Sequence, residues 1–156
     1  MNVRTVLVCA CLFAAISGAS AQTYTQQQLQ DIFMSQLGSD GLQPEILSSG
    51  KLRFRRDGRN YLIHIDDRDA LYFRMTMAFV ADDKTLTMRQ RRLEGCNTAT
   101  AEVKVVKCFL DEDGDPTFAS ELFVVVPGDF KLSMARMLRA MDSAYERYTR
   151  KVNEAR

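Results

Sequence analysis

The fold is decided at residues 54–65, which read FRRDGRNYLIHI. Asp57-Gly58 at the centre of this stretch is a strong signal for a β-hairpin, because both residue types tolerate the left-handed backbone of a tight turn. Apolar residues then alternate with polar ones, at Tyr61, Ile63 and Ile65. The stretch predicts two antiparallel strands that bury one face and leave the other polar.

The strand pattern continues on both sides of this hairpin. Residues 71–79 carry apolar side chains at every second position, which predicts a third strand with one buried face. Residues 45–47, ahead of the hairpin, are expected to form a further short strand. Because short connections join these strands, we expect an antiparallel meander.

Helices are predicted at both ends of the meander. Thr25 and Gln28 have capping-box spacing, and an apolar face follows at Leu29, Ile32, Phe33 and Leu37. Asp82 and Asp83 are expected to begin a second helix, since acidic residues suit its positive end. Its apolar face is predicted to comprise Leu86, Leu93 and Cys96, with Arg89, Arg91 and Arg92 largely elsewhere.

A second hairpin and a long amphipathic helix complete the chain. Residues 103–110 and 118–126 are predicted strands, joined by a turn at Asp113-Gly114. Apolar residues then recur at steps of three and four, at Phe130, Met134, Met137, Leu138, Met141, Tyr145, Tyr148 and Val152. The order α-β-β-β-(β)-α-β-β-α predicts an α+β fold, an antiparallel sheet with helices packed on it. Residues 22–156 are expected to form one such domain.

The first 21 residues have the three-part pattern of a secretory signal peptide. Arg4 is their only charge, residues 6–16 are uninterruptedly apolar, and Ala19-Ser20-Ala21 offers small residues for cleavage after Ala21. The alternatives are a membrane anchor or a lipoprotein modified at Cys9 or Cys11. We expect a periplasmic or secreted protein, with no stable membrane insertion after cleavage.

Cleavage would change both the charge balance and the cysteine count. The whole chain has 21 basic and 20 acidic residues, and loss of Arg4 would leave the two balanced. A near-neutral protein has no overall attraction to nucleic acid. Cys96 and Cys108 would be the remaining cysteines, and an oxidising compartment makes them a candidate disulfide. The alternative is two separately buried free thiols.

Several local strings occur in an order that resembles a known family. They are Phe54-x-x-Asp57-Gly58-x-x-Tyr61-x-Ile63, Leu71-Tyr72-Phe73, Asn97, Lys104-Val105-Val106-Lys107 leading into Asp111-x-Asp113-Gly114, Glu121-x-Phe123-Val124, and Phe130 opening the last helix. Together they resemble the YbjN family of candidate bacterial sensory transduction regulators, over about residues 24–148. The resemblance implies a fold similar to type III secretion chaperones, and it brings no catalytic residues.

Three groups of residues have ligand or acid–base chemistry. Residues 111–115 look like a calcium loop, but the Gly and Glu of an EF-hand are absent from their required positions, which favours a polar turn. His64 is the only histidine, and we interpret it as a surface residue of a strand. Asp66, Asp67 and Asp69 could act as acid and base, although a solvated turn is the simpler interpretation.

Two further groups suggest binding. The first hairpin is locally basic and could contact phosphates or an acidic partner, or simply present a charged strand surface, through Lys51, Arg53, Arg55, Arg56 and Arg59. The methionines favour core packing, although methionine also adapts to varied partners, at Met75, Met77, Met88, Met134, Met137 and Met141.

These observations predict a binding or adaptor module rather than an enzyme. We expect its partner to be a protein or peptide, or a second copy of the chain, and we expect no nucleic acid, metal or cofactor. The alternative hypothesis is a hydrolase whose Asp and Glu carboxylates converge in a concave site.

Overall fold

The computed structural model describes residues 23–154, which form three helices, six strands and a short 3-10 turn. The elements are α1 (Gln26–Ser39), β1 (Glu45–Ile46), β2 (Leu52–Arg56), β3 (Arg59–His64), β4 (Tyr72–Ala78), α2 (Leu86–Glu102), β5 (Val106–Leu110), β6 (Pro116–Phe123), η1 (Pro127–Phe130) and α3 (Lys131–Asn153). The predicted signal peptide falls within residues 1–22, outside the described part. Among the described residues, no helix is long and apolar enough to cross a membrane.

The strands form one antiparallel sheet in the order β1-β2-β3-β4-β6-β5. The β1–β4 meander and the β5–β6 hairpin are joined by pairing between β4 and β6, with Met75 opposite Ser120. The first hairpin turns as expected: Asp57 and Gly58 both have positive φ, at 49° and 75°. The α+β antiparallel fold class is confirmed.

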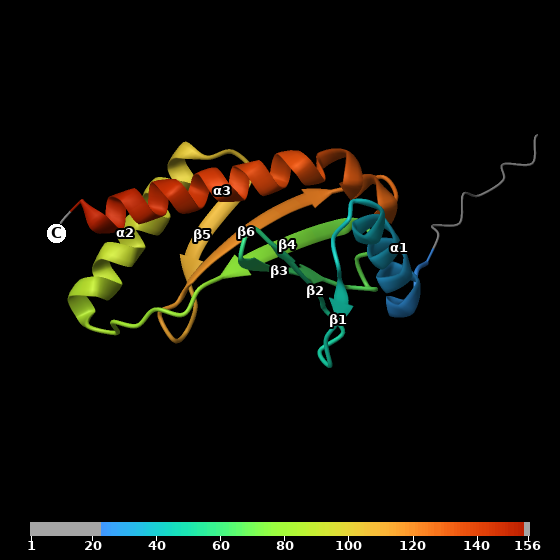
Figure 1. Cartoon of the computed structure of the whole chain (residues 1–156), viewed down its shortest axis with the longest axis horizontal. Helices are drawn as coiled ribbons and strands as arrows, with labels where there is room; N and C mark the ends of the chain where they lie inside the picture. The colour runs from blue at the N-terminus through green and yellow to red at the C-terminus, as the bar shows by residue number, and fades with distance from the viewer. Residues whose placement is uncertain (1–22, 155–156) are drawn as a thin grey trace, which may run out of the picture.

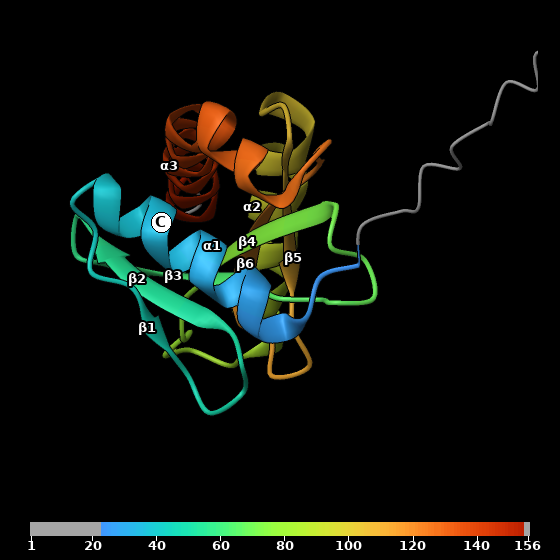
Figure 2. The ribbon, with the colours of Figure 1, turned by 90° about the vertical axis from the view of Figure 1, so that its right-hand side faces the viewer.

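The three helices pack on one face of the sheet. Figure 1 shows α3 running along the sheet, with α2 beside one end and α1 at the other; Figure 2 shows the same layers from the side. The core between the layers joins Phe33 of α1, Phe73 of β4 and Phe130, whose rings lie 4.6–5.7 Å apart. Met137 and Met141 of α3 and Met75 and Met77 of β4 are buried there, so these methionines serve the core.

The expected apolar face of α2 is confirmed at Cys96, which is buried, but is wrong at Leu86 and Leu93. Leu86 is 85% exposed and Leu93 38% exposed, whereas Arg92 is only 4% exposed. The helix instead turns Gly95 towards α3, where an added Cβ would lie 2.8 Å from a methyl carbon of Val152. The α2–α3 interface depends on close approach of the two helices at a glycine rather than on bulky apolar side chains. A pattern of apolar residues therefore does not predict which face of α2 is buried.

The boundaries of α2 and the second hairpin also differ from expectation. The helix begins after its N-cap Thr85, not at Asp82, and continues to Glu102. Strand β5 therefore starts at Val106 instead of position 103, after Val105 reverses the chain with φ of 59°. Strand β6 ends at Phe123, before the predicted position 126.

Cys96 of α2 and Cys108 of β5 are joined by a disulfide in the structure, with their Cα atoms 4.6 Å apart. The Cys108 backbone N–H, which points away from β6, donates to Thr100 Oγ1 at 2.8 Å. Residues of α2 thus both cross-link β5 and occupy part of its free edge. The residues between the two cysteines continue the helix as far as Glu102 and then turn back at 103–105 into β5.

Candidate functional site

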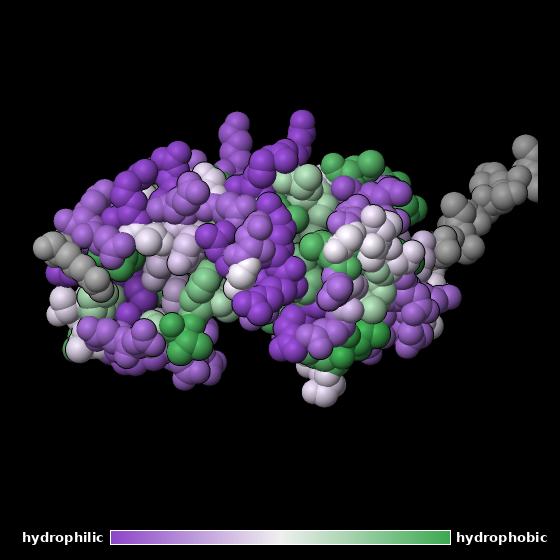
Figure 3. Space-filling view, in the orientation of Figure 1, coloured by the Kyte–Doolittle hydropathy of each residue, from purple (hydrophilic) through white to green (hydrophobic). Residues whose placement is uncertain are grey.

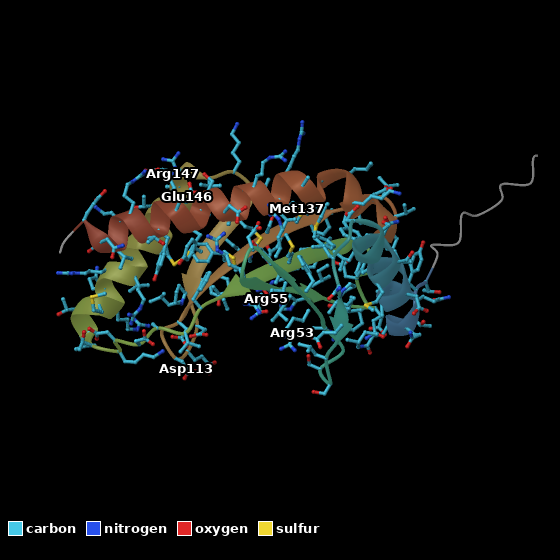
Figure 4. All side chains as sticks on the ribbon, viewed as in Figure 1. Arg53, Arg55, Asp113, Met137, Glu146 and Arg147 are labelled. Carbon is cyan, nitrogen blue, oxygen red and sulfur yellow. A yellow bond between two sulfur atoms is a disulfide. The ribbon has the colours of Figure 1, made fainter. Side chains whose placement is uncertain are left out.

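The face of the sheet opposite the helices carries a second set of side chains, which we call the open face. Its members alternate along the strands with the core residues: Glu45, Lys51, Arg53, Arg55, Asn60, Leu62, His64, Tyr72, Arg74, Thr76, Lys107, Phe109, Thr117, Ala119, Glu121 and Phe123. Figure 4 shows Arg53 and Arg55 on the side of β2 away from α3, with Met137 on α3 opposite. In Figure 3 the outline is indented on this side, between the β5–β6 turn and the β1–β2 turn.

Small side chains at the centre of the open face are flanked by long charged ones. Thr76 and Ala119 pair across β4 and β6 and are almost fully buried, at 4% and 1% exposure. Arg74 and Glu121 pair one step further along the same two strands. The centre of the open face therefore consists of small side chains, and a row of charged side chains lies beside it.

Glu121 is the centre of this charge cluster. Its carboxylate lies 2.6 Å from Lys107 Nζ and 3.3 Å from Arg74 Nε. Burial tends to raise the pKa of Glu121, but hydrogen bonds with Lys107 and Tyr72 and the nearby cations outweigh it, so the pKa is lowered. Arg74 Nε and Glu121 Oε1 are buried without a well-aligned hydrogen bond, so they form an ion pair rather than a full charge-assisted hydrogen bond.

His64 lies on the open face of β3, as expected of a surface residue of a strand, but it is half-buried rather than fully exposed. Its Nε2 lies 2.9 Å from Thr76 Oγ1 across β3 and β4. Burial, together with the Lys51 and Arg74 cations, lowers the pKa of His64 to about 4. The imidazole is therefore neutral at pH 7. The alternating pattern of β3 could not predict the contact with Thr76, because Thr76 belongs to another strand.

The acidic residues after β3 are not brought together as an acid–base pair. Asp66 accepts hydrogen bonds from the backbone N–H and the Nε of Arg68, both at 3.1 Å, and the Arg68 side chain lowers its pKa. Asp67 and Asp69 are exposed on the same turn. A polar hollow of about 400 Å³ lies between this turn, Gln26 and the open face, which makes the turn part of a solvated rim.

The candidate calcium loop is a hairpin turn. The Asp115 backbone N–H donates to Asp111 Oδ1 at 2.8 Å, and the Asp115 carboxylate accepts from the Ala81 N–H and pairs with Lys84. The carboxylates thus fix the β5–β6 turn and the segment before α2. Within residues 23–154, no group of three or more His, Cys, Asp or Glu side chains is arranged to hold a metal ion.

The basic hairpin divides between the two faces of the sheet. Arg56 and Arg59 approach Asp142 of α3, with nitrogen–oxygen distances of 3.5 and 2.7 Å, and the Arg59 guanidinium lies 4.6 Å from the centre of the Tyr145 ring. These two arginines therefore attach the hairpin to the helix.

The other basic residues of the hairpin lie on the open face. Arg53 pairs with Glu45 of β1. Lys51 and Arg55 have no ion-pair or hydrogen-bond partner for their side chains within the described residues. Sequence reasoning singled out the hairpin cations but missed Arg74, Lys107 and Glu121. The alternating pattern of each strand shows which face these residues occupy, but it does not show that β4 pairs with β6 and so brings them together.

The fold belongs to a known structural class. It is similar to the crystal structure of YbjN from E. coli, a candidate transcription regulator, with a TM-score of 0.55 over 81% of this chain and 90% of that chain. The two sequences are 17% identical, so the likeness shows a YbjN-like fold and not membership of the family. No protein-family profile matches the chain, and no curated protein matches its sequence.

Proposed function

We propose that this chain is a non-enzymatic binding module that holds a protein or peptide partner on the open face. The observation that carries the proposal is the one-sided arrangement of the layers: all three helices contribute to the core on one face, and charged and aromatic side chains occupy the other. An unpartnered sheet face of this kind is a ready surface for another molecule. Phe123 is 78% exposed beside Tyr72 and supplies an apolar anchor.

The fold likeness supports the same class of function by analogy. YbjN is described as a candidate regulator, and regulators act by binding. Because one fold hosts many functions, this analogy supports a regulator or adaptor role without identifying a ligand.

The hydrolase alternative gains no support from the carboxyl groups. A general acid at neutral pH needs a raised pKa. Among residues 23–154, every Asp or Glu whose pKa clearly departs from its usual value has a lowered pKa. These residues are Asp66, Asp115 and Glu121. Each lies in an ion pair with a neighbouring cation.

We further propose that the chain acts outside the cytoplasm after cleavage between Ala21 and Gln22. The apolar run and small residues described above support this location. N-terminal sequencing of the exported protein is expected to begin at Gln22. An intact Met1, or a lipid on Cys11, would contradict it.

Site-specific photo-crosslinking tests the binding role. A photoreactive residue replaces either Asn60 on the open face or Arg136 on the outer side of α3, both of which are exposed. Irradiation of intact cells is expected to give one adduct of defined mass from position 60 and none from position 136. The adduct from position 60 should also be lost when Arg55→Glu is added. Adducts from position 136 alone, or none from either position, would contradict the proposal.

A further inference from the structure

We infer that the partner held on the open face is an acidic protein segment, an inference that rests on the proposed function and specifies its chemistry. The open face has five cationic side chains and two carboxylates, a net charge of +3. The whole chain has a formal net charge of only +1. The open face is therefore locally positive in a nearly neutral protein, as is α3, which has six basic and two acidic residues between Lys131 and Asn153.

The cations of the open face are incompletely neutralised by the protein itself. Arg74 and Lys107 share the single carboxylate of Glu121. Lys51 and Arg55 are without a carboxylate partner in the part of the chain that the structure describes. A partner with carboxylates spaced along an extended segment would supply the missing counter-charges.

The nearest other acids reduce this excess but do not cancel it. Asp66, Asp67 and Asp69 on the β3–β4 turn border the face and, together with Arg68, contribute −2, so the +3 of the face falls to +1 when this rim is included. Asp142 lies on the far side of the sheet with Arg56 and Arg59. Neutral His64 adds no charge at pH 7. The face therefore keeps a positive formal charge at neutral pH.

The apolar residues of the face favour a protein segment over a nucleic acid. Leu62 and Phe109 lie among the cations and are partly exposed, and Phe123 extends the surface at its end. Apolar side chains of a partner could pack on them between its carboxylates. Duplex or single-stranded nucleic acid is usually bound by strongly basic domains, and this chain is nearly neutral.

Fluorescence anisotropy with the purified chain tests the inference. The probes are a fluorescein-labelled peptide that alternates Glu with Leu, the same peptide with Lys for Glu, and a single-stranded DNA of matching charge. The Glu peptide is expected to bind more tightly than either other probe, and its affinity is expected to fall as salt is added. Arg55→Glu should weaken its binding about tenfold.

Arg136→Glu is the matched control, because it makes the same charge change at an exposed position of α3 that has no ion-pair partner among residues 23–154. It should leave the affinity unchanged, and circular dichroism should show both variants folded. Equal weakening by the two variants would mean attraction to overall charge and would overturn the inference. Tighter binding of the DNA, or no binding of the Glu peptide, would also overturn it.

These outcomes are distinct from failure of the proposed function. If position 60 crosslinks a cellular partner but the Glu peptide does not bind, the open face is a binding surface for a partner of another chemistry. If position 60 crosslinks nothing, both proposals fail.

Discussion

His64 shows how one side chain acquires properties that its position in a strand does not predict. The imidazole contacts Thr76 and lies near Lys51, Arg74 and Glu121, and its burial is the main cause of its low pKa. In an unfolded chain the histidine pKa is about 6.5. Between about pH 4 and 6.5 the unfolded chain therefore binds more protons than the folded one.

This difference predicts a pH dependence of stability. The free energy of unfolding should fall as the pH is lowered through 6.5 towards 4, because protonation then favours the unfolded chain. Between pH 7 and 5 we expect a loss of about 1 kcal/mol, a value discounted for the partial exposure of the ring.

Urea denaturation at pH 7 and pH 5 measures this loss of unfolding free energy. In the His64→Asn variant most of the difference between the two pH values should disappear. Carboxyl groups with lowered pKa values lose their contribution mainly below pH 4.5 and therefore interfere little. An identical pH dependence in wild type and variant would contradict the assignment.

Gly95 makes a second prediction at the residue scale. Replacing a helical glycine with alanine ordinarily stabilises a helix by about 1 kcal/mol. At Gly95 the new Cβ would lie 2.9 Å from Tyr148 Cδ2 and 3.2 Å from its carbonyl oxygen, so we expect a net destabilisation of about 1–3 kcal/mol.

Gly38→Ala in α1 is the control, because no neighbouring atom lies within 4 Å of the position that its added Cβ would take. It should stabilise the protein slightly. Thermal unfolding of both variants provides the comparison, and stabilisation by Gly95→Ala would show that α2 and α3 are not so closely packed.

At the scale of the elements, the disulfide is the contact that fixes α2 on β5. Its two cysteines are 12 positions apart, and a cross-link that closes a loop of this size contributes roughly 3 kcal/mol. We expect Cys96→Ala with Cys108→Ala to lower the free energy of unfolding by about that amount. The Thr100 hydrogen bond to Cys108 remains available and should keep β5 covered.

The oxidation state is measured by alkylating the denatured, unreduced protein and determining its mass. Neither Cys96 nor Cys108 should react, and both should react after reduction. Full alkylation without a reductant would show that the bridge is absent from the protein as isolated.

The elements also show which structural features can be predicted from local sequence. The Asp57-Gly58 hairpin and the apolar face of α3 follow from turn chemistry and helical periodicity, and both are confirmed. The buried face of α2 depends on how closely Gly95 approaches α3, and the charge cluster around Glu121 depends on β4–β6 pairing. Neither is encoded in a local pattern, because each arises between segments far apart in the chain.

For the whole molecule, the decisive property is the separation of a helix-covered core face from an open, positively charged face. Hydrophobic alternation in the strands predicts that one face is buried, but it does not predict that all three helices share that face. The arrangement turns ordinary solvent-facing positions into a continuous surface. The low sequence identity to YbjN means that this surface must be tested in the chain itself.

Arginine modification by phenylglyoxal, with and without the non-covalently bound partner that crosslinking identifies, tests the central claim most directly. The reagent reaches exposed guanidinium groups, and peptide mass spectrometry reports Arg55 and Arg136 in the same sample. Both arginines are exposed in the structure of the single chain. The account predicts that the partner protects Arg55 and leaves Arg136 reactive. Protection of Arg136 with continued reaction at Arg55 would contradict it, since the partner would then bind the helical face.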